Sequence, residues 1–201
     1  MKNAGMHDIF GPGANVERRV VRDYGEIAKI TEALKKLGLR LALTSGAFDL
    51  FHEGHARYLE KAKSYGDVLI VGMDDDEKVR RQKGANRPMV EEGPRAETLC
   101  HSRHVDLVFI KRNNDPHWEL IKTVRPDTLI SIEETYTPEE RVLLKEYCGE
   151  VLMLERQAAT STTARIRDVL VSHTDELRGH FEKEVGEIFR RYVERLKGGM
   201  L

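Results

Sequence analysis

The sequence predicts an α/β domain built on a doubly wound, five-stranded parallel sheet. Short apolar segments alternate along the chain with segments of helical periodicity, the pattern expected when helices cover both faces of a parallel sheet. The chain has 201 residues, of which 40% are hydrophobic and 33% charged, so it can bury one substantial core. The predicted strands are residues 39–45, 67–73, 105–110, 127–131 and 150–154.

The helices are predicted from apolar spacing and from residues that begin or end a helix. Between Asp23 and Gly38, apolar residues recur at spacings of three and four, which predicts an amphipathic helix that ends at the glycine. Each later apolar strand is followed by a segment of the same kind. Further helices are predicted over residues 54–66, 75–83, 94–103, 115–125, 138–148 and 161–171.

Three regions follow from this pattern. Residues 1–22 show little periodicity and are predicted to be a lead-in, residues 23–171 form the α/β domain, and residues 172–201 form an added C-terminal helix. We expect the apolar stripe of this last helix to pack on its own domain. The alternative is that it joins two subunits of a homodimer. The stripe consists of Leu177, Phe181, Val185, Ile188, Phe189, Tyr192, Val193 and Leu196.

Composition excludes several classes of function. The formal net charge of −1 gives no global field that would hold nucleic acid or an anionic membrane, although a local basic cluster could bind a small polyanion. The two cysteines fit neither a disulfide framework nor a zinc site. There is no signal peptide and no apolar run near the roughly 18 residues that span a bilayer, so we expect a cytoplasmic protein.

Two histidines stand at the junction of the first strand and the next helix. His52 and His55 flank Gly54 in the segment "TSGAFDLFHEGH", residues 44–55. The glycine allows close approach to a ligand, and the helix that begins here offers unpaired N–H groups. Imidazoles on such an exposed turn can donate hydrogen bonds to phosphate. Metal binding is the rival interpretation, but no third or fourth ligand has a supporting spacing.

The segment "GAFDLFHEGH" resembles the signature G-x-F-D-x-x-H-x-G-H of a nucleotidyltransferase family. Two groups are most similar, the adenylyltransferases of bacterial ADP-heptose synthesis and the glycerol-3-phosphate cytidylyltransferases. "KGANRP" (residues 83–88) is similar to the K-G-x-x-R-P of the first group, and "STTARI" (161–166) to the S-T-T-x-I of both. The resemblance covers residues 23–171 and implies a Rossmann-like fold of the HIGH superfamily.

The resemblance also implies roles for individual residues. His52, His55 and Lys83 match catalytic groups that contact phosphates, and Lys83 and Arg87 match positions at the second substrate. Asp49 matches the signature aspartate and is expected to hold the turn, whereas Asp74, Asp75 and Glu77 are interpreted as a solvated helix start. The implied nucleotide-binding residues are Ala47, Phe48, His52, His55, Asp76, Arg156, Ser161, Thr162 and Thr163.

The implied reaction is nucleotidyl transfer to an acceptor that already has a phosphate group. The ionised acceptor oxygen attacks the α-phosphorus of ATP in line and pyrophosphate leaves, so no general base is needed. Magnesium is expected as cofactor, with no metal site made of protein residues. The partners implied are ATP and a phosphorylated sugar or polyol, heptose-1-phosphate-like, with no nucleic acid and no membrane.

Some positions depart from the family pattern and leave alternatives open. "SIEETY" (residues 131–136) replaces the K-G-G-D-Y of the heptose group and the G-D-D of the cytidylyl group. Arg156 matches an arginine typical of the cytidylyl group, so a CTP-dependent enzyme acting on a polyol phosphate is the first alternative. A nucleotide-binding regulatory module without turnover is the second. A fragment related to class I aminoacyl-tRNA synthetases has less support, because no K-M-S-K-S-like loop is present.

Overall fold

The structure is a computed structural model that describes residues 15–133, 135–155 and 177–191, together with positions 171, 174 and 194. The chain divides into two compact units, residues 1–159 and 160–201. The first unit contains the sheet and the second contains the C-terminal helix, and each is described by itself.

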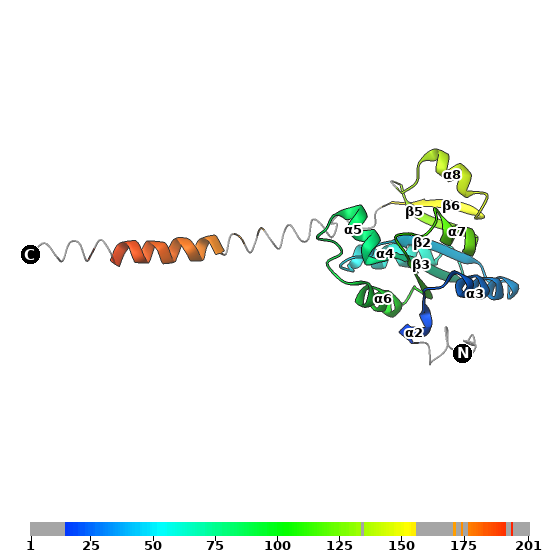
Figure 1. Ribbon diagram of the computed structural model, residues 1–201, viewed down its shortest axis with the longest axis horizontal. Helices are drawn as coiled ribbons and strands as arrows, with labels where there is room; N and C mark the ends of the chain where they lie inside the picture. Colours follow the sequence, from blue (N-terminus) through cyan, green and yellow to red (C-terminus); the bar gives the residue numbers. More distant parts are fainter. Residues whose placement is uncertain are drawn as a thin grey trace, which may run out of the picture. The chain divides into compact units, whose positions relative to one another are not determined.

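The first unit is a six-stranded parallel sheet in the order β1-β4-β3-β2-β5-β6, with helices on both faces (Figure 1). All five predicted strands are confirmed. The sixth, β1, pairs with β4 at the sheet edge and was not predicted, because two residues are too few to show a period. The strands are β1 Val20–Val21, β2 Leu41–Gly46, β3 Val68–Asp74, β4 Leu107–Lys111, β5 Thr128–Ile132 and β6 Glu150–Leu154.

Most helices lie where the sequence predicts, but the helix Val16–Arg19 falls in the predicted lead-in, and the helix predicted over 138–148 ends at Leu144. The helix predicted over 115–125 is shorter and spans only Glu119–Val124. Trp118 and Arg125, which adopt left-handed backbone, end the helix on either side. The helix predicted over 161–171 lies outside the described residues. The described helices of this unit are α2 Val16–Arg19, α3 Tyr24–Lys36, α4 Glu53–Lys63, α5 Asp76–Lys83, α6 Glu92–His101, α7 Glu119–Val124 and α8 Pro138–Leu144.

The core lies on both sides of the sheet. Because side chains alternate along a strand, Leu43 and Ile70 contribute to one buried cluster with α3 and α7, while Leu69 and Val71 contribute to the other with α4 and α6. Every residue of β3 is buried, as expected for a central strand covered on both faces. The fold class predicted from the sequence is thereby confirmed, with one more strand than expected.

The strand order reverses beside β2. The chain passes from β2 to β3 and β4 on one side and then returns to β5 on the other side of β2. In open α/β sheets the crevice at such a switch point, outside the carboxyl ends of the strands, is where ligands bind. The segment with the two histidines follows the carboxyl end of β2 directly, so the topology places it at this crevice.

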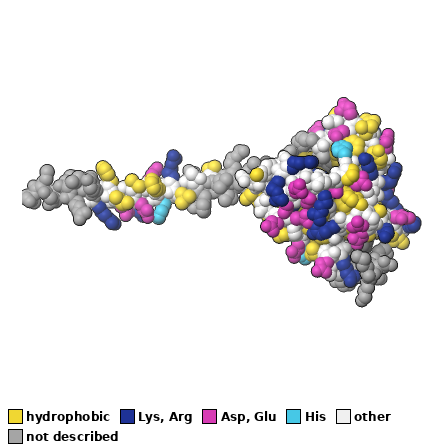
Figure 2. All heavy atoms as spheres, in the orientation of Figure 1, with side chains coloured by type: hydrophobic (Ala, Val, Ile, Leu, Met, Phe, Trp, Pro, Cys, Tyr) yellow, Lys and Arg dark blue, Asp and Glu magenta, His cyan; other side chains and the backbone are white. Residues whose placement is uncertain are grey.

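The second unit contains one described helical stretch, residues 177–191 (Figure 1). Five large apolar side chains of this stretch are between 47% and 69% exposed, among charged neighbours (Figure 2). They are Leu177, Phe181, Val185, Ile188 and Phe189. Tyr192, Val193 and Leu196, the rest of the predicted stripe, lie outside the described residues. Among the helices that the structure describes, none has the length and apolarity needed to cross a bilayer.

Candidate active site

The turn between β2 and α4 has an unusual backbone. Phe48 and Leu50 have φ angles of 48° and 49°, in the left-handed region that bulky side chains rarely adopt. Such strain persists only where the surrounding structure enforces it, and it concentrates at functional sites. The two left-handed residues turn the chain from the end of β2 into α4 within a few positions, so that His52 and His55 start the helix.

His52 is the N-cap of α4. Its backbone is extended, and its Nδ1 accepts a hydrogen bond of 3.1 Å from the N–H of Gly54. A side-chain acceptor at this position satisfies one of the N–H groups that the first helical turn leaves unpaired. Because Nδ1 is the acceptor, the neutral imidazole has its hydrogen on Nε2. The cap therefore fixes both the orientation of the ring and the nitrogen that can donate to a ligand.

His55 lies one helical turn further and stacks on His52. The ring centroids are 4.1 Å apart with an interplanar angle of 25°, and the rings of Phe48 and Phe51 lie 5.5 and 5.6 Å away. Nδ1 of His55 is buried without a hydrogen-bond partner among the described residues. Both imidazoles are of intermediate exposure, so the turn is less exposed than predicted. The aromatic rings of the same turn shield them.

Burial decides the charge of His55. Burial first, and then the electrostatic effects of His52 and Lys83, lower the pKa of this imidazole from 6.5 to about 4, against a smaller opposite effect of Asp49. His55 is therefore neutral at pH 7 and acts as a polar hydrogen-bonding group rather than a cation. The effect of Lys83, the last residue of α5, indicates that this side chain is within electrostatic range of His55.

Asp49 joins the histidine turn to the loop between α5 and α6. Its carboxylate accepts hydrogen bonds from the N–H groups of Met89 and Val90, at 3.0 and 3.1 Å, and from Nη1 of Arg87 at 2.9 Å. Burial opposes ionisation, but these donors hold the pKa of Asp49 below its ordinary value. The "KGANRP" loop and the histidine turn thus meet at one buried carboxylate, with Arg87 and Asp49 38 positions apart in the sequence.

A buried arginine that the sequence analysis did not single out lies behind the turn. Arg95 of α6 is 2% exposed. It donates to the carbonyl oxygen of Ala47 (2.5 Å), to that of Asp74 (3.0 Å) and to Oδ1 of Asp76 (2.6 Å). The carboxylate of Asp76, predicted to face the nucleotide, is thus engaged by Arg95. An arginine immediately before buried Ala96 in an otherwise apolar helix face was the available signal.

The acidic run after β3 is less solvated than predicted. Asp74 and Asp75 are both buried, so their interpretation as a solvated helix start was wrong. Oδ1 of Asp74 lies 3.2 Å from Nζ of Lys111 and 3.5 Å from Nζ of Lys78. Asp75 is the N-cap of α5 and accepts from the N–H of Lys78. Glu77 is exposed, as expected.

A family model described as cytidylyltransferase-like matches residues 43–167, from β2 through the histidine turn to the far side of the sheet. The chain belongs to the cytidylyltransferase-like family. The nucleotidyltransferase resemblance found in the sequence is thereby confirmed.

Relatives of this family member include two proteins named bifunctional protein HldE. The one from Geobacter metallireducens is 38% identical over 159 residues, which are 78% of this chain and 32% of that protein. The one from a Nitratiruptor species is 41% identical over 144 residues, 72% of this chain and 30% of that protein. The chain therefore spans about a third of the length of these relatives.

A solved structure has the same fold. The lipopolysaccharide core biosynthesis protein from Thermoplasma volcanium is 21% identical, with a TM-score of 0.53 over 59% of this chain and 98% of that one. At this level of identity the match concerns the fold, and it agrees with the doubly wound sheet described above.

The cytidylyltransferase-like match extends over predicted site residues that the structure does not describe. Arg156, Ser161, Thr162 and Thr163 lie outside the described residues, so their proximity to the histidines stays a prediction. Of the described candidates, Ala47, Phe48, His52 and His55 share one turn. Lys83 and Arg87 come from the adjoining α5–α6 connection, and Asp76 begins α5 behind them.

The loop that departs from the family pattern is held by α8. Arg141 donates to the carbonyl oxygens of Tyr136 and Glu133, at 3.1 and 2.8 Å. The ring of Tyr136 packs against the core cluster and lies edge-on to Trp118, with centroids 6.4 Å apart. The loop follows β5 directly and therefore lies at the switch point, opposite the histidine turn. Its side chains differ from those of the family pattern.

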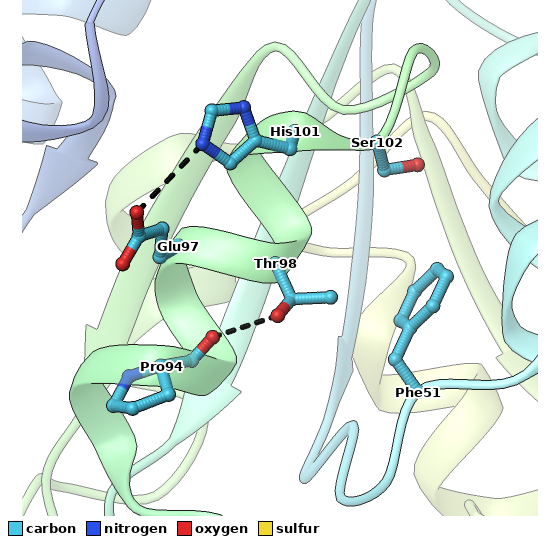
Figure 3. Close-up of a pocket in the computed structure, with 6 residues that line it drawn as sticks. All are labelled: Phe51, Pro94, Glu97, Thr98, His101 and Ser102. Atoms are coloured by element: carbon cyan, nitrogen blue, oxygen red, sulfur yellow. Dashed lines mark hydrogen bonds and ion pairs between the residues drawn. The ribbon is translucent and has the colours of Figure 1, made fainter.

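A shallow hollow of about 540 Å³ lies beside the histidine turn (Figure 3). Phe51, whose ring also neighbours His55, forms one wall, and Pro94, Glu97, Thr98, His101 and Ser102 of α6 and its end form the other. The lining contains no lysine or arginine, so this hollow lacks the cations that a triphosphate requires.

Protein residues alone do not fit a magnesium ion. Within residues 15–133 and 135–155 no group of three or more His, Cys, Asp or Glu side chains could hold a metal. The carboxylates nearest the turn are each paired with a cation, Asp49 with Arg87, Asp76 with Arg95 and Asp74 with Lys111. Magnesium, which prefers carboxylate and phosphate oxygens, would find its ligands on a nucleotide instead.

The cap predicts a stability difference at His52. His52→Ala removes the acceptor for the Gly54 N–H and should lower the free energy of unfolding by about 1 kcal/mol, whereas His52→Asn retains an N-cap acceptor and should stay close to wild type. Urea denaturation of the three proteins measures the difference. Equal stability of the alanine and asparagine variants would show that the imidazole is not needed as a cap.

His55 predicts a pH dependence of stability. The pKa of this imidazole is lowered in the folded state. As the pH falls, the unfolded chain therefore binds a proton at His55 near pH 6.5, whereas the folded chain binds it only near pH 4. The stabilisation is present above pH 6.5 and is lost as the pH falls towards 4, by up to about 3 kcal/mol. His55→Gln should lose less stability than wild type between these pH values in urea titrations. Parallel curves for the two proteins would contradict a neutral, buried His55.

Proposed function

We propose that the protein transfers AMP from ATP to a phosphorylated sugar or polyol, heptose-1-phosphate-like, with release of pyrophosphate. The observation that supports this most is the stacked pair His52 and His55 at the switch point of the sheet, with Lys83 close by. Membership of the cytidylyltransferase-like family and the similarity to the HldE proteins support the same class of reaction. Both substrates are cytoplasmic metabolites, so the cytoplasm remains the predicted location.

The chemistry needs positioning and charge stabilisation more than a base. A phosphate oxygen of the acceptor attacks the α-phosphorus of ATP, a new P–O bond forms, and the bond to the β-phosphate oxygen breaks. Pyrophosphate leaves with that electron pair. The acceptor oxygen is already ionised, so no proton has to be removed. Nε2–H of His52, the imidazole of His55 and the start of α4 supply donors for the developing charge.

The neutral state of His55 fits this role. A neutral imidazole donates a hydrogen bond without adding a cation to a site that already contains Lys83, and it needs no counterion before substrate arrives. An anionic phosphate nearby would stabilise the protonated form. His55 can therefore gain positive character as negative charge builds up on the triphosphate, which favours the transition state over the free enzyme.

Two basic residues, Lys83 at the end of α5 and Arg87 in the loop that follows, are proposed to bind the phosphates of different substrates. Lys83 lies near His55 and is assigned to the triphosphate. Arg87 is held against Asp49 at the other side of the turn and is assigned to the acceptor phosphate. Magnesium is proposed to enter bound to ATP, as part of the substrate, because Asp49, Asp76 and Asp74, the carboxylates nearest the turn, are paired with cations.

The main prediction concerns turnover. Pyrophosphate release should be detected with ATP and a sugar-1-phosphate or polyol phosphate, and His55→Ala should lower kcat by about 10²- to 10³-fold because a donor to developing charge is lost. His55→Asn should recover part of this, since its amide still donates. CTP run in parallel tests the cytidylyl alternative. Nucleotide binding without pyrophosphate release from any acceptor would instead support the regulatory module.

A homodimer is proposed through the C-terminal helix. Five exposed apolar side chains on residues 177–191 would gain stability from burial against a second copy. Replacing Phe181 and Phe189 with glutamate should lower the mass in solution from dimer to monomer in light scattering, while Arg178→Glu, on the same helix, should leave it unchanged. A wild-type protein that is monomeric at all concentrations would contradict this proposal.

A further inference from the structure

Arg95 connects the carboxyl ends of two neighbouring strands from inside the protein. One carbonyl that it binds, that of Ala47, follows β2, and the other, that of Asp74, ends β3. Its charge is balanced by Asp76. Nε of Arg95 is buried and has no partner among the described residues, which costs stability. A buried cation with an unpaired donor contributes little to stability, so stability alone does not explain an arginine at this position.

The contact with Ala47 fixes the peptide group that joins Ala47 to Phe48. This peptide is trans, so its carbonyl and its N–H point in opposite directions. Because the carbonyl is bound to Arg95 in the interior, the N–H of Phe48 is directed away from Arg95. Within residues 15–133 and 135–155 this N–H has no hydrogen-bond acceptor, although Phe48 is buried. An N–H group without a protein acceptor at the switch point of the sheet can donate to a ligand bound there.

The same contact holds the strained turn. Phe48 and Leu50 adopt left-handed backbone between the Ala47 carbonyl and the N-cap His52. Without a fixed donor at the Ala47 carbonyl, this peptide could rotate and relieve the strain at Phe48. Rotation would move the Phe48 ring away from His55, whose centroid lies 5.5 Å from it. The burial that keeps His55 neutral therefore depends on the orientation of one peptide group.

We propose that Arg95 is a positioning residue for nucleotidyl transfer, which fixes the Ala47–Phe48 peptide so that the Phe48 N–H donates to a phosphate of the nucleotide and the histidine turn keeps its shape. The assignment rests on the proposed function for the identity of the ligand. Arg95 does not touch the substrate, since its guanidinium lies behind the turn. It acts through Phe48 and, through the Phe48 ring, on His55.

The test compares Arg95→Lys with Arg19→Lys. Lysine keeps the charge but cannot reach two carbonyls and a carboxylate at once. Arg19 is a matched control, because it too donates to three groups that are distant in sequence. Its acceptors are the main-chain carbonyls of Cys100, Val105 and Asp106, at the opposite end of β4. Arg95→Lys should lower kcat by about 10²-fold, as expected for a misplaced catalytic turn, with a much smaller change in KM. Arg19→Lys should leave kcat unchanged.

Two NMR measurements separate positioning from general stability. In wild type the amide proton of Phe48 should shift when ATP is added, and this shift should be absent in Arg95→Lys. The pKa of His55 should rise from about 4 towards its ordinary value in Arg95→Lys and stay low in Arg19→Lys. A folded Arg95→Lys protein in which the ATP-induced Phe48 shift and the His55 pKa match those of Arg19→Lys would overturn the proposal.

Failure to fold is also decisive. If Arg95→Lys and Arg95→Gln both unfold while Arg19→Lys and Arg19→Gln fold, Arg95 is structural and the positioning role is wrong. Absence of pyrophosphate release by the wild-type enzyme would count against the proposed reaction. It would leave the NMR comparison to decide on Arg95, because the Phe48 amide and the His55 pKa are measured without turnover.

Discussion

The left-handed backbone after β2 is the constraint on which the rest of the site depends. Phe48 and Leu50 bring the chain from a buried strand to the start of α4 within six residues. Two polar side chains hold that turn: Arg95 of α6 donates to the Ala47 carbonyl from the interior, and Asp49, within the turn, accepts from the α5–α6 loop. Each is buried and each is paired. The histidines can be oriented because the backbone that presents them is enclosed by these contacts.

Much of the fold could be predicted because it depends on periodicity. Each long strand is an apolar run, and α3 and α4 end where glycine or polar residues interrupt the pattern. What the sequence could not show were features without a period. β1 has only two residues. It is part of the sheet because it pairs with Val108 and Phe109 of β4, which are nearly 90 positions away in the sequence. The shortening of α7 depends on the backbone conformation of Trp118 and Arg125.

The candidate site likewise contains features that the sequence could show and features that it could not. His52 and His55 were found because their spacing matches a family signature, whereas the N-cap role of His52 depends on a ring orientation that spacing does not specify. Asp74 and Asp75 were misjudged because an acidic run at a helix start is usually solvated, and here Lys111 from the neighbouring strand covers it. Arg95 was missed because its hydrogen-bond partners, Ala47, Asp74 and Asp76, are 19 to 48 positions away in the sequence.

The short strand β1 has a consequence for the edge of the sheet. β4 would otherwise present its free backbone N–H and C=O groups to solvent, and exposed edges of this kind pair with other chains. Val20 and Val21 cover part of that edge, and Arg19 binds the carbonyls before β4 begins. A domain trimmed to the region shared with its family would lose this cover. The N-terminal segment therefore covers part of a strand edge that could otherwise pair with another chain, and it does so away from the carboxyl end of the sheet.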